Sequence, residues 1–437
     1  MGYLQQLFKP TIEQIHAIVR RNAKQHTNVS KQVISLIKQV QQGQDEALLH
    51  LCRLYDSPSL SSVVVPKKAI ADASEAVEPA LKEAIKRAKR NIETFHKAQI
   101  PKDEKVETEK GLWCWRKSVP LQRVGLYIPG GSAPLFSTVL MLGVPAKIAG
   151  CPSIALATPA QKDGSVHPAT LYAASLCGID EIYAMGGAQA IAALAYGTQS
   201  IANVDKIFGP GNRYVTEAKM HVSSTCSIDM PAGPSEVMVV IDKKSNLQYA
   251  AADLLSQAEH GSDSQVVALI YCSDNQEAMS IIAALENELT IQLGALSRKE
   301  IAAKSLQKSW VLTTSSVSEA AHLINAYAPE HLLLQTAFNE ELVSLITHAG
   351  SVFVGPYACE ALGDYASGTN HTLPTDGWAR SVGGVSVDSF YKKITFQSAT
   401  RQALHSLGPS VMLMAQKERL DAHAAAVKVR LEKGKED

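Results

Sequence analysis

The sequence predicts an α/β protein with two doubly wound sheets, each covered by helices on both faces. From about residue 120 onward, short apolar runs typical of buried strands alternate with helical segments. Strands that are buried on both faces and separated by helices form parallel βαβ units. Shifts in the pattern near residues 120 and 235 divide this region into two sheets. The strand-like runs are 153–158, 182–185, 204–208, 236–241, 265–272, 309–314 and 351–354.

The segments on either side of these runs have other patterns. The first hundred residues are predicted to be helical, and a β-rich stretch follows over 113–128. The segment from about Ser410 to Glu432 is predicted to be a helix with a charged face. Pro79 suits the first turn of an amphipathic helix. The apolar face of that helix has spacings of four and three: Leu81, Ile85, Ala88, Ile92 and Phe95. The expected parts are an N-terminal helical region packing on the core (1–120), two α/β domains (121–234 and 235–377) and a C-terminal tail (378–437).

Composition limits the classes of partner. Apolar residues make up 46% and charged residues 19%, which excludes a mainly disordered chain. Lys+Arg and Asp+Glu are both 42, so charge gives no reason to expect nucleic acid or an anionic membrane. No apolar run approaches the roughly 20 residues of a membrane-spanning helix. Seven scattered cysteines without a CxxC pair indicate reduced thiols. We therefore expect a cytoplasmic protein that acts on a small molecule.

The segment Asn246–His260 is predicted to be a helix closed by Gly261. Gln257 and His260 are three residues apart and share a face of this helix. A neutral imidazole in the last turn is a good ligand for zinc. A histidine that caps the end carbonyls is the alternative, and it is the more common case for such a residue taken alone.

Glu330 and His331 form an acid–imidazole pair directly after Pro329. The proline disfavours helix at the preceding residue, so a loop or a new helix start is expected here. Adjacent residues on a helix point about 100° apart. The pair is therefore poorly suited to chelating one ion but suited to two separate proton transfers on one substrate. A solvated helix start with an acidic first turn explains it equally well.

Two further segments carry an acid and an imidazole. Asp364 and His371 lie in a predicted loop of small residues, where an Asx turn would explain Asp364 without function. Glu418 and His423 are five residues apart, about 140° of rotation on one helix. They can serve one small site only if a helix starts between them or the ligand is large. A solvated helix is the alternative.

Two turns next to strands could bind a ligand through their backbone groups. The turn from Gly209 to Asn212 lies between a strand and a helix, where open α/β sheets bind ligands. The rigid turn over 230–236 contains Ser235 and precedes the strand VMVVI. No G-x-G-x-x-G occurs at a strand-to-helix turn, so this pattern alone does not predict a dinucleotide.

Eight segments in order resemble the histidinol dehydrogenase family over about residues 120 to 425. They are RVGLYIPGG with APL after it, GGAQAIAALAYGT, DKIFGPGN, IDMPAGPSE, LLSQAEHG, YAPEHL, GDYASGTNHTLPT and ERLDAH. One departure is Arg419, which stands where many relatives have glycine.

The resemblance implies the site residues and the cofactors. One Zn²⁺ per subunit would be held by Gln257, His260, Asp364 and His423. The substrate would contact Ser235, Gln257, His260, His331, Asp364, His371, Glu418 and His423. NAD⁺ would contact Tyr127, Gln189 and Asn212 on an incomplete, Rossmann-like sheet that lacks the glycine fingerprint.

The resemblance also implies a reaction and an assembly. L-histidinol would be oxidised through L-histidinal to L-histidine, the final steps of histidine biosynthesis, with two NAD⁺ reduced. His331 would remove the hydroxyl proton, and Glu330 would activate the water that adds to the aldehyde. The chain would form a homodimer in which the tail brings Glu418 and His423 to the partner's site.

Three rival hypotheses stay open on the sequence. In a zinc hydrolase, Glu330 would activate water against an amide. A sister dehydrogenase would oxidise another small amino- or sulfo-alcohol. A noncatalytic relative is the third, although every expected catalytic position is occupied.

Overall fold

The computed structural model describes residues 2–19, 26–130 and 133–432, which fall into two compact units. The first unit comprises Met1–Gln99 and Leu121–Phe390, and the second comprises Ile100–Pro120 and Tyr391–Asp437. The four-part division expected from the sequence stays a prediction. Within the described ranges, no helix combines the length and apolar character needed to cross a membrane.

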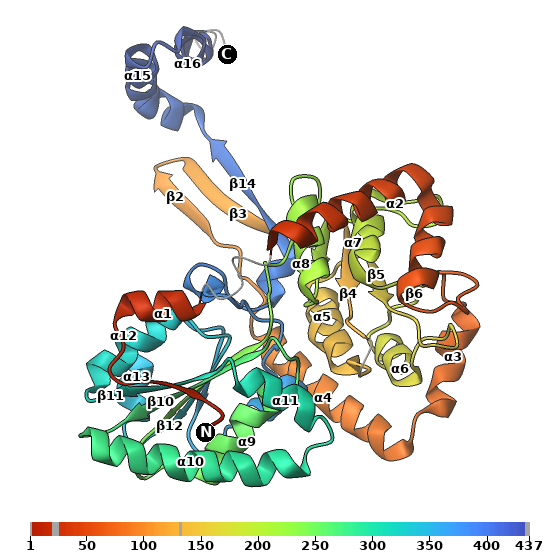
Figure 1. Cartoon of the computed structure of the whole chain (residues 1–437). Helices are drawn as coiled ribbons and strands as arrows, with labels where there is room; N and C mark the ends of the chain where they lie inside the picture. The colour runs from red at the N-terminus through yellow and green to blue at the C-terminus, as the bar shows by residue number, and fades with distance from the viewer. Residues whose placement is uncertain (1, 20–25, 131–132, 433–437) are drawn as a thin grey trace. The chain divides into compact units, whose positions relative to one another are not determined.

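The first unit contains a five-stranded parallel sheet in the order β6-β5-β4-β7-β8. Helices α5 (Phe136–Ala149) and α6 (Pro168–Leu176) pack on one face, with α3 (Lys67–Ala76) and α4 (Pro79–Lys97) outside them. Helices α7 (Gly187–Tyr196) and α8 (Arg213–Val222) cover the other face beneath α2 (His26–Tyr55) (Figure 1). The strands are β4 (Arg123–Tyr127), β5 (Ser153–Thr158), β6 (Glu181–Ala184), β7 (Lys206–Phe208) and β8 (Ser227–Ile228).

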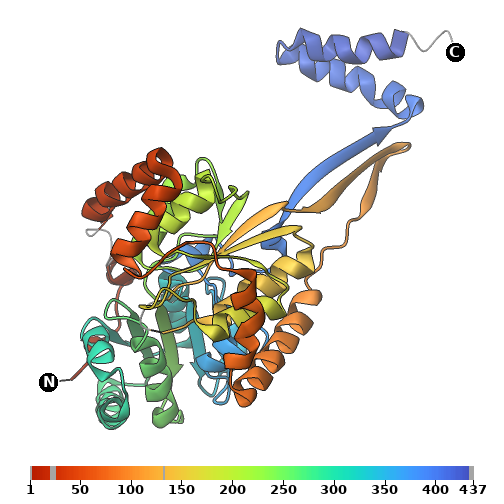
Figure 2. The same cartoon turned by 90° about the vertical axis from the view of Figure 1, so that its right-hand side faces the viewer.

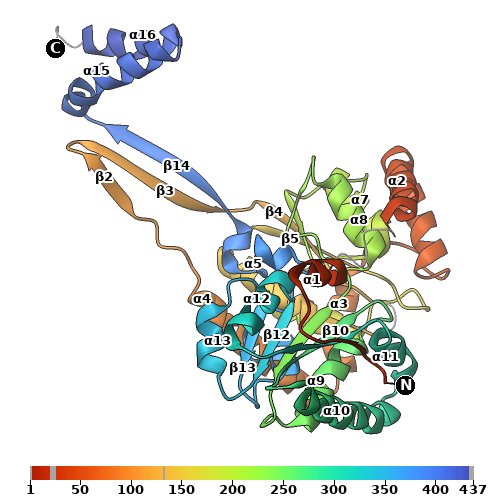
Figure 3. The same cartoon turned by 60° about the vertical axis from the view of Figure 1, so that its left-hand side comes forward.

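A six-stranded parallel sheet follows in the order β1-β11-β10-β9-β12-β13. Its strands are β1 (Gln5–Leu7), β9 (Glu236–Ile241), β10 (Gln265–Tyr271), β11 (Trp310–Thr314), β12 (His331–Gln335) and β13 (Ser351–Val354). Its helices, seen around the sheet in Figure 3, are α9 (Leu247–Ala258), α10 (Asn275–Ala295), α11 (Lys299–Leu306), α1 (Ile12–Val19), α12 (Val317–Tyr327) and α13 (Asn339–Leu345). Val237 and Val239 of β9 pack with α9–α11, while Met238 and Val240 pack with α1, α12 and α13. Successive side chains of a strand point to opposite faces of the sheet, so a strand that is buried on both faces contributes to two hydrophobic cores.

The second unit is a three-stranded antiparallel ribbon followed by two helices. Strand β3 (Leu112–Pro120) lies between β2 (Lys105–Glu109) and β14 (Tyr391–Ala399). Helices α15 (Arg401–Lys417) and α16 (Asp421–Glu432) pack side by side, as Figure 2 shows. Gly408 allows this close approach, because a Cβ there would lie 3.0 Å from Val427.

Parallel sheets and covering helices confirm the α/β class with two doubly wound sheets, but several local expectations were wrong. The expected helix from Ser410 to Glu432 is two helices, broken at Arg419 with φ of 61°. Strand β12 was missed, because its five buried residues directly follow the turn at Pro329. On α4, His96 is buried and Phe95 is 47% exposed, so the apolar face ends one residue away from the expected position.

Candidate active site

A pocket of about 300 Å³ lies where the carboxyl edge of the five-stranded sheet meets the amino edge of the six-stranded sheet. Pro129 and Asn212 line it from the first sheet, after β4 and β7. The second sheet contributes residues that directly precede or begin its strands. The end of α9 with the residues after it, and the segment 364–371, complete the wall. These residues are Ser235, Gln257, His260, Glu330, His331, Asp364 and His371.

Glu330 and His331 occupy the floor of this pocket. Ala328 ends α12 in a left-handed conformation with φ of 56°, and Pro329 then leads into β12, which begins at His331. The expected loop is present before the pair, but the alternative of a new helix start was wrong. Glu330 Oε2 lies 3.6 Å from His331 Nδ1, so the two side chains converge although they are adjacent in sequence.

Hydrogen bonds fix the orientation of Glu330. The backbone N–H of Glu236 donates to Glu330 Oε2 at 2.8 Å, and Gln257 Nε2 donates to the same oxygen at 3.3 Å. Gln257 Nε2 also donates to the Glu236 carbonyl at 3.0 Å. Both N–H groups of the Gln257 amide thus have acceptors within the protein. Its Oε1, buried and without a hydrogen-bond partner, is the atom left for a ligand.

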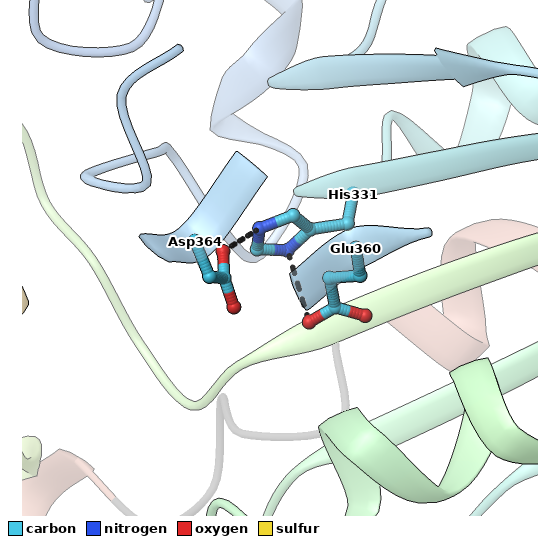
Figure 4. A group of neighbouring side chains, drawn as sticks. All are labelled: His331, Glu360 and Asp364. Carbon is cyan, nitrogen blue, oxygen red and sulfur yellow. Dashed lines mark ion pairs between the residues drawn. The ribbon is translucent and has the colours of Figure 1, made fainter. Parts of the chain in front are cut away.

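The His331 ring lies between carboxylates on both sides (Figure 4). Its Nε2 is 3.3 Å from Asp364 Oδ1, and its Nδ1 is 4.0 Å from Glu360 Oε1. Burial lowers the pKa of His331, but the charges of Glu360 and Glu330 outweigh it and raise the pKa well above 6.5. Burial raises the pKa of Glu360 well above 4.5, with Asp364 adding repulsion. The site concentrates negative charge around a single imidazole.

Glu360 is the residue that sequence reasoning missed. It begins α14 (Glu360–Tyr365), four residues before Asp364, and both face His331 from one side of this helix. The ligand atoms of His331, Glu360 and Asp364 lie within 4.8 Å of one another, a group that could hold a metal ion. The i,i+4 spacing of two acids was the available signal. The expected loop at Asp364 was wrong, because α14 includes it.

Two other expected residues line the same pocket with different surroundings. His260 is exposed in a turn, because α9 ends at Ala258 with Glu259 as its C-cap. The helix thus stops before His260, and the expected cap at Gly261 was wrong. His371 Nδ1 lies 2.8 Å from the Asp364 carbonyl, and its Nε2 lies 3.1 Å from Thr138 Oγ1. Burial lowers the pKa of His371, which favours its neutral form.

Glu418 and His423 belong to the second unit, where both side chains are exposed. Glu418 caps the end of α15 and His423 lies in the first turn of α16. A helix start therefore separates them, which is the condition under which the sequence allowed both to serve one site.

A second pocket, of about 740 Å³, opens at the carboxyl edge of the five-stranded sheet. Tyr127, Gln189 and Asn212 line it, together with residues of α2 that the sequence did not indicate. The Gly187 N–H, at the start of α7, donates to Tyr127 Oη at 3.1 Å. Asn212 caps α8 through its Oδ1 and lines both pockets, so the two cavities share a wall.

A family model described as histidinol dehydrogenase matches residues 19–431. This chain belongs to the histidinol dehydrogenase family. A histidinol dehydrogenase from Bacteroides fragilis strain YCH46 is 50% identical over 97% of this chain and 98% of its own length. One from Campylobacter jejuni strain RM1221 is 49% identical over 92% of this chain and 93% of its own length.

A solved structure of this family has the same fold. The crystal structure of histidinol dehydrogenase from Elizabethkingia anophelis matches with a TM-score of 0.93 and 44% identity, covering 99% of each chain. The family match favours an oxidoreductase over the zinc hydrolase and the noncatalytic relative.

Proposed function

We propose that this chain oxidises L-histidinol through L-histidinal to L-histidine, reducing two NAD⁺ and consuming one water. The arrangement that carries the proposal is the shared wall at Asn212. It joins a pocket with two proton-transfer groups, Glu330 and His331, to a larger pocket at the edge of a Rossmann-like sheet. NAD⁺, when bound, would accept the hydride of each oxidation.

The positions of the two groups support separate tasks. The His331 Nδ1 lies 3.3 Å from the Glu236 carbonyl, an acceptor, and 3.2 Å from Gln257 Nε2, a donor; a proton on Nδ1 would be held by the carbonyl. Nε2, which lies 3.3 Å from Asp364 Oδ1, would then be the basic atom. In the first step, Nε2 would take the hydroxyl proton as the aldehyde forms. In the second, the Glu330 carboxylate would take a proton from water as the water adds to the aldehyde.

The residues in the pocket fit a zinc ion. Among the described residues, Gln257 Oε1 is buried without a hydrogen-bond partner and Asp364 Oδ1 is buried beside only His331 Nε2, while His260 is exposed at the same pocket. Nitrogen and oxygen donors of this kind are ordinary zinc ligands, with glutamine the weakest of them. Zinc, when bound, would orient the imidazole and amino groups of the substrate. His331 must be neutral to accept a proton, and positive charge is needed to offset the carboxylates around it.

We propose that the fourth ligand, His423, and the substrate contact Glu418 come from the partner of a homodimer. The second unit supports this, because it exposes apolar side chains of its strands and helices that a partner would cover. The most exposed of these are Val106, Leu413, Met414 and Val429.

Mixing two inactive variants tests the shared site. Glu330→Gln damages the pocket and His423→Ala damages the tail. A mixed dimer would contain one intact site, so reassociation at equal concentrations should restore about a quarter of wild-type activity. A site built within one subunit would give no recovery.

The stoichiometry of NADH tests the reaction itself. We expect two NADH per histidinol, with activity lost on zinc chelation and restored by added Zn²⁺. One NADH per substrate would indicate a sister dehydrogenase acting on another amino- or sulfo-alcohol. Release of an acid from an amide without NADH would indicate the hydrolase. A cytoplasmic location is proposed with this function, since NAD⁺ is needed as a co-substrate.

A further inference from the structure

Lys219 and Asp229 form a buried ion pair beneath the turn that ends β7. Lys219 lies on α8 and Asp229 follows β8, and their side chains are 2% and 1% exposed. Removing two charges from water costs free energy that a surface pair does not require, so such a pair is weak evidence for stability alone. The hydrogen bonds that the pair makes indicate what it holds.

Both members of the pair bind the same residue, Gly209. The Gly209 N–H donates to Asp229 Oδ2 at 2.7 Å, and Lys219 Nζ donates to the Gly209 carbonyl at 2.9 Å. Gly209 has a φ of 126°, and a Cβ at this position would collide with the carbonyl oxygen of Tyr127. The ion pair therefore binds both the N–H and the carbonyl of Gly209 and holds this residue against the end of β4.

Gly209 begins the turn that carries Asn212. Pro210 limits the backbone freedom of this turn, and Asn212 closes it by capping α8. Lys219 lies on the same helix, so the turn is anchored at its start by the ion pair and at its end by the helix cap. A shift of Gly209 would move Tyr127 and Asn212, both of which line the larger pocket.

We propose that the Lys219–Asp229 pair positions the turn Gly209–Asn212 for binding of the nicotinamide dinucleotide. The pair acts through Gly209 and contacts no reacting atom, so both members are positioning residues. This inference rests on the proposed function, in which the larger pocket binds NAD⁺. The competing explanation is that the pair only stabilises the sheet.

A neutral double variant separates these explanations. Lys219→Met with Asp229→Asn removes the donor to the Gly209 carbonyl without leaving an unpaired buried charge. The amide oxygen introduced by Asp229→Asn can still accept from the Gly209 N–H, and the amide nitrogen then faces the Met230 N–H, which donates to Asp229 Oδ1 in the wild type. Because small displacements of a binding group are costly, the KM and Kd for NAD⁺ should rise about tenfold or more. The KM for histidinol should rise several-fold less than that for NAD⁺, because Pro210, Gly211 and Asn212 also line the smaller pocket.

A matched control lies at the opposite edge of the same sheet. Arg123 begins β4 and pairs with Glu181, which begins β6, at the amino ends of these strands. Arg123→Met with Glu181→Gln removes an ion pair from this sheet without altering Gly209. We expect it to lower the melting temperature while both KM values stay as in the wild type.

The outcomes distinguish the inference from the proposed function. An unchanged KM for NAD⁺ in the Lys219/Asp229 variant, or an equal rise in both KM values, overturns the positioning role. If the double variant is recovered only unfolded, Lys219→Arg alone, which keeps both charges but displaces the donor to the Gly209 carbonyl, carries the same test with the same expected difference between the two KM values. A wild-type chain that forms no NADH from histidinol would instead refute the proposed function.

Discussion

Replacing Glu330 with glutamine should separate the two oxidations. Glutamine keeps one oxygen to accept from the Glu236 N–H and from Gln257 Nε2, bonds of 2.8 and 3.3 Å in the wild type. The fold should therefore lose only about 1 kcal/mol, the difference between bonds to a charged and to a neutral acceptor. The substitution removes the carboxylate that we propose activates water, and a general base contributes about 10²- to 10⁴-fold in rate.

This loss corresponds to about 2.7–5.5 kcal/mol in the barrier of the second oxidation. The first oxidation is proposed to depend on His331 and should slow less than about tenfold, because Glu330 acts on it only through its position and charge beside the ring. Single-turnover NADH formation would be measured with histidinol and, separately, with histidinal. We expect a first NADH at near-normal rate and a second that is strongly delayed.

Glu360→Gln is the matched control for this experiment. Glu360 lies 4.0 Å from His331, as buried as Glu330, but it does not line the pocket. Its neutralisation changes the charge around His331 without removing a group from the pocket, so it should not slow the second oxidation selectively. Equal losses in both half-reactions of Glu330→Gln, at unchanged melting temperature, would refute the assignment of water activation to Glu330.

Three further substitutions test local features. Arg419→Gly should stabilise the protein by about 1 kcal/mol in denaturant unfolding, because arginine at φ of 61° is strained; lower stability would contradict this. Burial raises the pKa of Asp253 from 3.8 to about 6, so folding favours its protonated form. Wild-type stability relative to Asp253→Asn should thus fall by on the order of 3 kcal/mol as pH rises from about 4 to above 6, and a flat difference would argue against it. Gly363→Ala would place a Cβ 2.6 Å from the Phe353 ring, which stacks on His331, so kcat should fall; an unchanged kcat would show that Phe353 moves freely.

The sequence predicted the buried strands better than the site. Runs such as 153–158 and 236–241 match β5 and β9 in their bounds, because residues buried on both faces leave a continuous apolar signal. Strand β12 has the same burial but was hidden by the turn before it. Local pattern could not show that Glu330 and His331 face each other, since this depends on a strand start.

Local residue patterns could not predict which residues, distant in the sequence, come together in the fold. His331 meets Asp364 and Glu360 because β12 and α14 pack together, a contact that no local spacing encodes. The resemblance to a family supplied Asp364 and Gln257, and the structure places both at one pocket. Glu360 was outside that resemblance and became visible only through its distance to His331.

The two sheets have the same strand order but use opposite edges. Numbered along the chain, β4–β8 have the order 3-2-1-4-5, and β9–β13 repeat it with β1 added outside. Ligands of such sheets bind at the carboxyl edge, between strands 1 and 4, and the larger pocket lies there in the first sheet. In the second sheet, polar groups at this edge hydrogen-bond to one another. Gln335 donates to Asp253 at 2.6 Å, and the Ala337 N–H donates to Asp242 at 2.8 Å.

At its amino edge, the second sheet lines the pocket that we propose for the substrate. Helix α9 runs back along the sheet from the carboxyl edge, so its last turn delivers Gln257 to the start of β9 and β12. A carboxyl edge for the cofactor then faces an amino edge carrying the acid and base groups. This opposition arises because the pocket residues of the first sheet follow its strands, whereas those of the second sheet precede or begin its strands. The proposed hydride transfer needs this arrangement, because the carbon that loses the hydride must lie between the proton-transfer groups and the cofactor.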